Sequence, residues 1–474
     1  MARTGHGRTI FAALALAAAS LSLGPSQARA QGATDYPIPS TAREVFGPIA
    51  EGFESPIDPD ESLREPKSHV DPRVERLKSR RAERQAAPFF RDTDLRAHSR
   101  TYWFSEDSFT GTEPQALTTG GYISYQSGYL ADFFQLRGVL YTSQPLYAGE
   151  DAGDTLNLTP NGAEITALGQ ANARFEFARQ ELTVGRQLVR TPYVNPYYDR
   201  MIPLTYEGVV LLPEDNESRR LDYILSYLWG YKERNQPDFI PLSEGLGVAE
   251  DNGVLIAGLS RRARRWSYGV TNYWIKDTLN TAYAEIDYLL PVGGGEDGPS
   301  FRVGVNDLDQ RTVGADLIAG APYETHQASA RLIASYKNFV LTGAVAKTAD
   351  GAAIQNPFGF SPVYTAMYIS SFNRAGEFGY LVTLSYNFAR IGLDGVTFQV
   401  GWGQGFDAID SATGEALANE SELDLRFVYE PHRGKLQGLR LELEYIDWVM
   451  PQPENPSDDL TQLRAIVNYV VPLY

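Results

Sequence analysis

The stretch LRLELEYIDW (residues 439–448) carries an apolar side chain at nearly every second position, with charged side chains between most of them. Successive side chains of a β-strand point to opposite faces, so a strand with this sequence has one apolar and one charged face. The same alternation occurs in FRVGVND (301–307), FGYLVTLSYNF (378–388) and LDLRFVYE (423–430). These segments predict an all-β chain whose strands are each apolar on one face only.

Two architectures use such strands: a soluble sandwich buries the apolar faces against each other, and a membrane barrel turns them to lipid. The predicted connections alternate between short and long along the chain, which is typical of an outer-membrane barrel. Short connections are expected near Leu130, Arg179, Ala263, Lys337 and Ile391. Long connections are expected at about 105–118, 144–164, 188–203, 230–252, 308–326, 348–376, 403–419 and 450–459. The sequence therefore predicts a transmembrane antiparallel β-barrel with short periplasmic turns and long extracellular loops.

The number of strands follows from these connections. About 18 strands fit between Arg100 and Tyr474, and an even number leaves both ends of the barrel in the periplasm. The segment YTAMYISSF (364–372) also has the composition of a strand. Counting it would move the loop 403–419 to the periplasmic side, so we assign it to the long loop that ends before Glu377.

The N-terminal residues predict export and a separate leader. Arg3 and Arg8 precede the short apolar run FAALALAAASLSLG (11–24), and an A-x-A site ends at Ala30. This pattern is typical of a cleaved signal peptide, and the run is shorter than the roughly 20 residues of a membrane-spanning helix. We therefore expect a signal peptide at 1–30, a flexible periplasmic leader with a short charged helix at 31–97, and a barrel domain at 98–474 in the bacterial outer membrane.

Composition excludes several classes of protein. The chain has no cysteine, so it has neither disulfides nor thiolate metal ligands. Its formal charge is -17, and removal of the three arginines in the signal leaves -20, so nucleic acid is not an expected partner. The mean hydropathy of -0.30 excludes a helical membrane protein but leaves a barrel open, because only half of each barrel strand is apolar.

Catalytic and metal-binding patterns are missing from the sequence. The histidines after the signal are His69, His98, His326 and His432, and none belongs to an HExxH motif. No GxSxG elbow is present either. We expect no enzyme activity, no catalytic residues, no metal site and no cofactor.

The long connection GRQLVRTPYVNPYYDRMIPLTYEG (185–208) is unusual because it combines three arginines with three prolines and several tyrosines. An open barrel of this strand number would be a wide aqueous channel, so selectivity needs something inside it. The segment could fold inward and supply fixed charge. It could also stay exposed and bind lipopolysaccharide phosphates or water. The residues alone leave both alternatives open.

Seven segments together resemble the OprD-type outer-membrane porins, which are substrate-selective channels of Gram-negative bacteria. They are GYISYQSGY (121–129), GRQLVRTP (185–192), DRMIPLTYEG (199–208), SFNRAGEFGY (371–380), NFARIGLDGV (387–396), KLQGLRLELEY (435–445) and RAIVNYVVPL (464–473). The resemblance implies an 18-stranded barrel, with a homotrimer as one assembly, that passes small, often carboxylate-bearing solutes by diffusion. It also implies that the third extracellular loop folds inward, with the residues matching DRMIP (199–203) at the narrowest point. The expected constriction residues are Arg186, Arg190, Asp199, Arg200 and Glu207.

Strand parity predicts which arginines face the lumen. If leucine, phenylalanine and tyrosine face lipid, the alternate positions face inward, and a charge at mid-depth on the lipid face would cost about 2–4 kcal/mol. The arginines on this inner face are Arg302, Arg331, Arg426, Arg440 and Arg464. They resemble the basic ladder of the family and would pass a carboxylate from one site to the next. Alternatively, they pair with inward carboxylates such as Glu442 and Glu444 and give a neutral wall.

Two functions remain after this reading of the sequence. The favoured one is an outer-membrane porin for small solutes, embedded in lipid and lipopolysaccharide. The other is a plugged barrel with a structural or binding role, in which the leader could be the plug.

Overall fold

The structure is a computed structural model of the chain and describes residues 87–109, 111–213, 221–263, 265–290, 298–318, 321–431, 436–451 and 459–472. The expected signal peptide and most of the expected leader lie outside the described residues. The elements are α3 (Pro88–Arg91), β1 (Asp94–Ser108), β2 (Gln115–Gln126), β3 (Phe134–Ala148), η2 (Ala152–Thr155), β4 (Ile165–Phe177), β5 (Gln180–Gln187), β6 (Thr205–Pro213), β7 (Asp222–Lys232), β8 (Ile240–Pro241), η3 (Leu242–Leu246), β9 (Val254–Arg262), β10 (Trp266–Ile275), β11 (Leu279–Leu289), β12 (Ser300–Thr312), β13 (Glu324–Tyr336), β14 (Phe339–Thr348), β15 (Phe378–Asn387), η4 (Phe388–Ile391), β16 (Val396–Phe406), β17 (Glu420–Tyr429), β18 (Leu439–Val449) and β19 (Asp459–Pro472).

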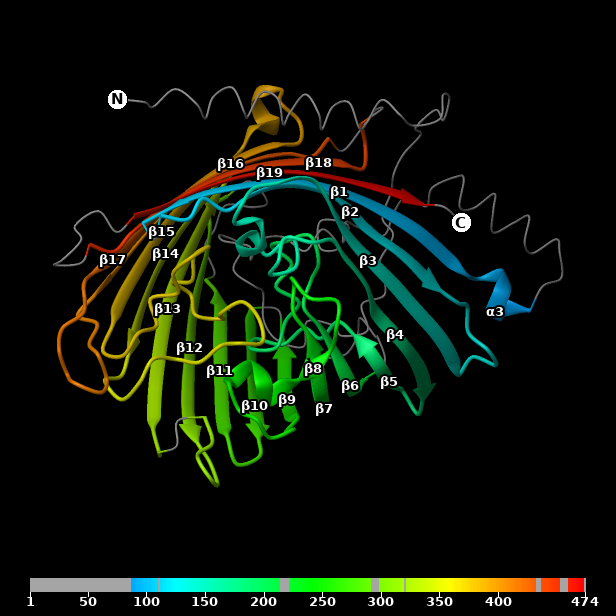
Figure 1. The fold of residues 1–474 in the computed structure, drawn as a ribbon, viewed down its shortest axis with the longest axis horizontal. Helices are drawn as coiled ribbons and strands as arrows, with labels where there is room; N and C mark the ends of the chain where they lie inside the picture. Colours follow the sequence, from blue (N-terminus) through cyan, green and yellow to red (C-terminus); the bar gives the residue numbers. More distant parts are fainter. Residues whose placement is uncertain are drawn as a thin grey trace.

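The strands form one closed antiparallel barrel (Figure 1). Each long strand pairs with its neighbours in sequence, and β1 pairs with β19 from Arg96 opposite Pro472 to Ser108 opposite Leu460. Without the two-residue β8, the described residues contribute 18 strands to this ring. The predicted architecture and strand number are confirmed. No described helix is both long and apolar enough to cross a membrane.

The alternation of the sequence corresponds to the two faces of the barrel wall. On β12 the outward side chains Val303 and Val305 are exposed, while Asn306 between Val305 and Asp307 is buried inside. The predicted parity also holds on β15, where Val382 and Leu384 are exposed and Thr383 is buried. The apolar exposed face is the one that a lipid bilayer would cover.

Longer loops and shorter turns alternate around much of the barrel, although the first loop (109–114) is no longer than the turn that follows it (127–133). The loops on the long-loop end cover residues 109–114, 149–164, 188–204, 233–253, 313–323, 349–377, 407–419 and 450–458, and a ninth connection spans only 276–278. This tight turn was absent from the predicted set of long loops, and it is stabilised by Asp277 in a left-handed conformation. The first and sixth loops are shorter than predicted, because β1, β2, β12 and β13 continue their pairing into polar sequence that no longer alternates.

The loops at residues 188–204 and 349–377 enter the barrel. We call residues 188–204 the third loop and residues 349–377 the seventh loop, counting along the long-loop end. Both contribute residues to buried clusters with inward-facing wall side chains. Figure 1 shows coil segments in the space that the strands surround. The segment 364–372 belongs to the seventh loop and not to a strand, as predicted.

Candidate functional site

The third loop lies along the inner wall formed by β1 to β4. Its Met201 and Ile202 are fully buried against aromatic side chains of β1, including Tyr102 and Phe104. The Tyr102 hydroxyl donates a hydrogen bond of 3.1 Å to the backbone carbonyl of Asp199. Apolar packing and this buried bond together fix the loop inside the barrel, as the family resemblance implied.

A network of charges is centred on Asp199, whose side chain is 2% exposed. Arg200 donates from Nη1 to Asp199 Oδ2 at 2.5 Å, and Arg234 of the fourth loop (233–253) donates to Oδ1 of the same carboxylate. Arg200 also donates from Nε to the carbonyl of Thr155 at 3.0 Å, which ties the third loop to the second. One carboxylate therefore holds two guanidinium groups from two different loops.

The wall adds a third arginine to this network. The guanidinium of Arg464 on β19 lies 5.9 Å from the ring centre of Phe104, and the guanidinium of Arg200 lies 5.0 Å from the same ring. Burial acts to raise the pKa of the Asp199 carboxyl, but Arg200 and Arg234, with Arg464 behind them, outweigh it and hold that pKa below its usual value. The carboxylate is therefore ionised at neutral pH and balances one of its two guanidinium partners.

The seventh loop crosses the lumen and hydrogen-bonds to the third loop. Asn195 exchanges two bonds with Phe360, one from its side-chain amide to the carbonyl and one to its side-chain oxygen from the backbone amide, both 2.9 Å. At the far wall, Glu422 of β17 accepts the backbone amides of Ile369 and Ser370 at 2.9 and 2.7 Å. Tyr368 donates to Glu444 of β18 at 2.7 Å. The loop therefore spans from the third loop to the wall of β17 and β18.

Three inward-facing glycines form a bed for the base of the seventh loop. Gly379, Gly403 and Gly405 lie on the neighbouring strands β15 and β16, and a Cβ atom on any of them would come within 3.0 Å of Phe372. Phe372 itself is fully buried with Met367. Because glycine leaves room for the ring directly on the backbone, these positions determine where the seventh loop rests.

We expect Phe372→Ala to loosen the seventh loop without unfolding the barrel. Loss of a buried phenylalanine ring costs roughly 3–5 kcal/mol in protein cores, and here the loss acts on the loop's own packing. The variant should show frequent current fluctuations in single-channel recordings where the native protein is quiet. Phe406→Ala is the matched control, because Phe406 lies on the outward parity of β16. Quiet recordings from Phe372→Ala would contradict the role of the glycine bed.

The structure does not bring all five expected constriction residues together. Asp199 and Arg200 lie in the network described above, and Arg190 is buried in the third loop. Arg186 and Glu207 share the outward parity of β5 and β6 and pair with each other across these strands at 3.4 Å. Their neighbours on that face are apolar, whereas the alternate positions face the lumen. The expectation that these two line the constriction therefore disagrees with their strand parity, and we leave them out of it.

The five predicted wall arginines all occupy the inward parity of their strands. Four of them lie within ion-pair distance of wall carboxylates. These contacts are Arg331 with Asp287 at 2.9 Å, Arg426 with Glu442, Arg440 with Glu430 at 2.5 Å and with Glu442 at 3.3 Å, and Arg464 with Glu444 at 3.4 Å. The contacts favour the alternative in which much of the wall charge is neutralised by its neighbours.

Two cations that sequence reasoning missed lie beside the third loop. Arg234 follows the end of β7 in a polar loop, where no periodicity indicates a direction, so only the structure reveals its bond to Asp199. Arg100 faces inward on β1, and its guanidinium lies 4.6 Å from the ring centre of Tyr198. No carboxylate of the described residues lies within ion-pair distance of Arg100, and the inward parity of β1 could have identified this arginine. Tyr368, missed for the same reason as Arg234, joins the loop to the wall.

The described residues contain no arrangement typical of catalysis. His326 faces outward on β13 and lies 2.7 Å from Asp307, whereas Ser329 faces inward toward Asn306. The two side chains are on opposite faces of the strand and cannot act as a nucleophile and base. No group of three potential metal-ligating side chains occurs among the residues that the structure describes.

Comparisons with known proteins agree with this geometry. The family model described as "outer membrane porin, OprD family" matches residues 87–473. Among solved structures, Pseudomonas aeruginosa OpdK with vanillate matches with a TM-score of 0.69 and 19% identity, covering 81% of this chain and 99% of that chain. Pseudomonas aeruginosa OccK9 (OpdG) matches with a TM-score of 0.73 and 19% identity, over 82% of this chain and 100% of that chain. Acinetobacter baumannii OccAB3 matches with a TM-score of 0.72 and 18% identity, over 80% of this chain and 99% of that chain. No curated protein sequence matches the chain.

Proposed function

Since the chain belongs to the OprD family of outer membrane porins, we propose that its lumen selects small carboxylate-bearing solutes at a constriction between the third and seventh loops. The observation that carries this proposal is the pair of bonds between Asn195 and Phe360, which joins the two loops inside the barrel. The arginines of the Asp199 network lie on the third-loop side of this junction. The long loops would then lie outside the cell and the short turns in the periplasm.

The charge of the constriction supports an anionic solute. Asp199 balances one of its two guanidinium partners, so Arg200 and Arg234 together leave about one positive charge near the junction. Arg234 is the more accessible of the two, at 18% exposure against 7% for Arg200. A guanidinium can hold a carboxylate through two parallel hydrogen bonds. One of the similar structures holds vanillate, an aromatic carboxylate.

The most direct test is the ion selectivity of the Arg234→Ala variant in a planar bilayer. We expect the native channel to prefer chloride over potassium, and we expect the variant to lose roughly half or more of that preference, because the accessible charge is gone while Asp199 remains. Arg186→Ala is the matched control, since Arg186 lies on the outer face. Equal reversal potentials for the native protein and Arg234→Ala would remove this arginine from the constriction. Absence of current from a folded native protein would favour the plugged barrel.

A further inference from the structure

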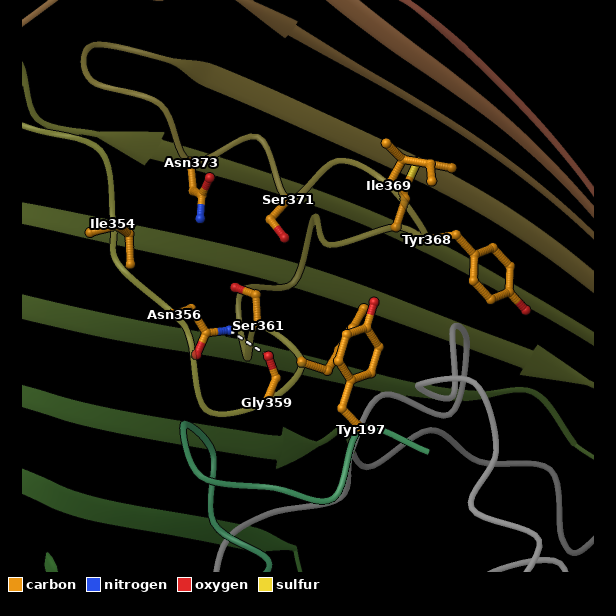
Figure 2. Close-up of a pocket in the computed structure, with 11 residues that line it drawn as sticks. Tyr197, Ile354, Asn356, Gly359, Ser361, Tyr368, Ile369, Ser371 and Asn373 are labelled. Carbon is orange, nitrogen blue, oxygen red and sulfur yellow. Dashed lines mark hydrogen bonds between the residues drawn. The ribbon is translucent and has the colours of Figure 1, made fainter. Parts of the chain in front are cut away.

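A cavity of about 260 Å³ lies between the third and seventh loops. Tyr197 comes from the third loop, and the other ten lining residues come from the seventh (Figure 2). None of these eleven residues is acidic or basic. The volume is below the roughly 300–1,000 Å³ of pockets for drug-sized ligands, so it suits a solute with a single ring.

Two buried polar atoms at this cavity have no hydrogen-bond partner among the described residues. Ser361 is 6% exposed, and its Oγ is buried without a partner. Asn356 donates from Nδ2 to the carbonyl of Gly359 at 3.2 Å, and its Oδ1 is also buried without a partner. The bond to Gly359 determines which end of this amide is which, because a carbonyl accepts only from the NH₂ group. Buried polar groups are normally satisfied, so these atoms indicate where a ligand would bond.

The unsatisfied atoms also indicate the chemistry of that ligand. Asn356 Oδ1 can only accept, so the ligand must bring a donor, and Ser361 Oγ can donate or accept. A carboxylate brings acceptors only and would lose its hydration without meeting a cation in the cavity. Hydroxyl groups satisfy both atoms at no electrostatic cost. In Figure 2 the polar ends of Ser361, Ser371 and Asn373 turn toward the same space.

Apolar side chains complete the cavity. Phe360 and Tyr197 face each other with ring centres 5.4 Å apart, and Ile354 and Met367 add aliphatic surface. Arg234 does not line the cavity, and its guanidinium lies 4.3 Å from the ring centre of Tyr197. An apolar lining with a few convergent polar groups is the usual composition of a small-molecule site.

We propose that this cavity binds a neutral, hydroxyl-bearing solute with one ring, such as a monosaccharide. This proposal extends the proposed function, because it adds an uncharged binding station beside the charged constriction of the same pore. A charged solute would be selected at the arginines, and a neutral one would be retained at the loop junction.

The test is saturation-transfer NMR of glucose with the detergent-solubilised full chain, compared with Ser361→Ala. We expect a glucose signal from the native protein and binding that is roughly three- to tenfold weaker in Ser361→Ala, the effect of losing one hydrogen bond. Ser371→Ala should weaken binding as well and serves if the first variant does not fold. Ser335→Ala is the matched control. Ser335 also faces the lumen but lies near the end of β13 that is away from the long loops, so this variant should bind glucose as the native protein does.

Each outcome bears on the proposal. No glucose signal would overturn it, because water would then be the only occupant. Equal signals from the native protein and Ser361→Ala would also overturn it, because glucose would then bind away from Ser361. Stronger binding of benzoate than glucose with the same dependence on Ser361 would also overturn it. The NMR measurement does not depend on ion current, so the two proposals can fail separately. A protein that binds glucose but conducts no current would support the binding cavity and refute the proposed channel. A protein that conducts current but binds no glucose would support the channel and refute the binding cavity.

Discussion

Replacing residues 355–372 by a short glycine–serine linker should raise the single-channel conductance roughly two- to fivefold. These residues form the part of the seventh loop that crosses the lumen and meets the third loop at Asn195. An 18-stranded barrel without such a segment leaves a wide aqueous channel, whose conductance is limited by the wall and not by a narrow point. The effect should therefore exceed that of any single side-chain change in the pore.

The design of this deletion follows from the hydrogen bonds at the base of the loop. Ile354 donates its backbone amide to the carbonyl of Asn373 at 3.1 Å, so the two ends of the excised segment are already adjacent. A short linker can join them without disturbing β14 or β15. The eighth loop offers a control: replacing its exposed residues 411–415 by the same linker should leave conductance unchanged.

An unchanged conductance after removal of 355–372, in a protein that still resists heat as the native barrel does, would contradict a constriction at the loop junction. The third loop alone would then set the pore size. A variant that combines this deletion with Asn195→Ala would distinguish a pore size set by the native third loop from one set by a third loop that has shifted to compensate. Asn195 is chosen because it bonds to the deleted segment.

The period-two pattern predicted the barrel because it reflects one physical constraint repeated on every strand: one face meets lipid and the other meets water. The same pattern, applied to β5 and β6, places Arg186 with Leu182 and Val184, and Glu207 with Val209 and Leu211. Parity thus gives the outer face for both residues. The family resemblance pointed to the constriction instead, whereas the structure pairs Arg186 and Glu207 across β5 and β6 on the outward parity of both strands.

The partners of the pore charges could not be read from the sequence in the same way. Asp199 and Arg234 are separated by the whole of β6 and β7, and both lie in loops whose direction depends on packing against other loops. The wall carboxylates were visible by parity as candidate partners, yet which arginine each one contacts depends on the register of neighbouring strands. Sequence reasoning therefore identified the loop and its charges but not the network between them.

Asp199→Asn should loosen the third loop and leave the buried guanidinium of Arg200 and the partly buried guanidinium of Arg234 without their shared carboxylate. Removing one partner of a buried ion pair typically costs about 3–5 kcal/mol, because the remaining charge stays desolvated and unpaired. Here Arg200 and Arg234 would also repel each other and Arg464. We expect a lower temperature of thermal unfolding, unstable current levels and a stronger preference for anions during the open periods.

The stability difference between the native protein and Asp199→Asn should depend on pH in a defined direction. The pKa of Asp199 is lower in the folded protein than the ordinary value, so its ionised form stabilises the fold above about pH 4, and that contribution disappears as pH falls through the lower folded value. The native protein should therefore exceed Asp199→Asn in stability by a constant amount from about pH 5 to 8, and the two should converge in strong acid. Glu415→Gln, which removes one exposed carboxylate from the eighth loop, is the control and should show no such difference. Equal stability of native and Asp199→Asn at pH 7 would mean that the arginines find other acceptors, and the network would then not hold the third loop in place.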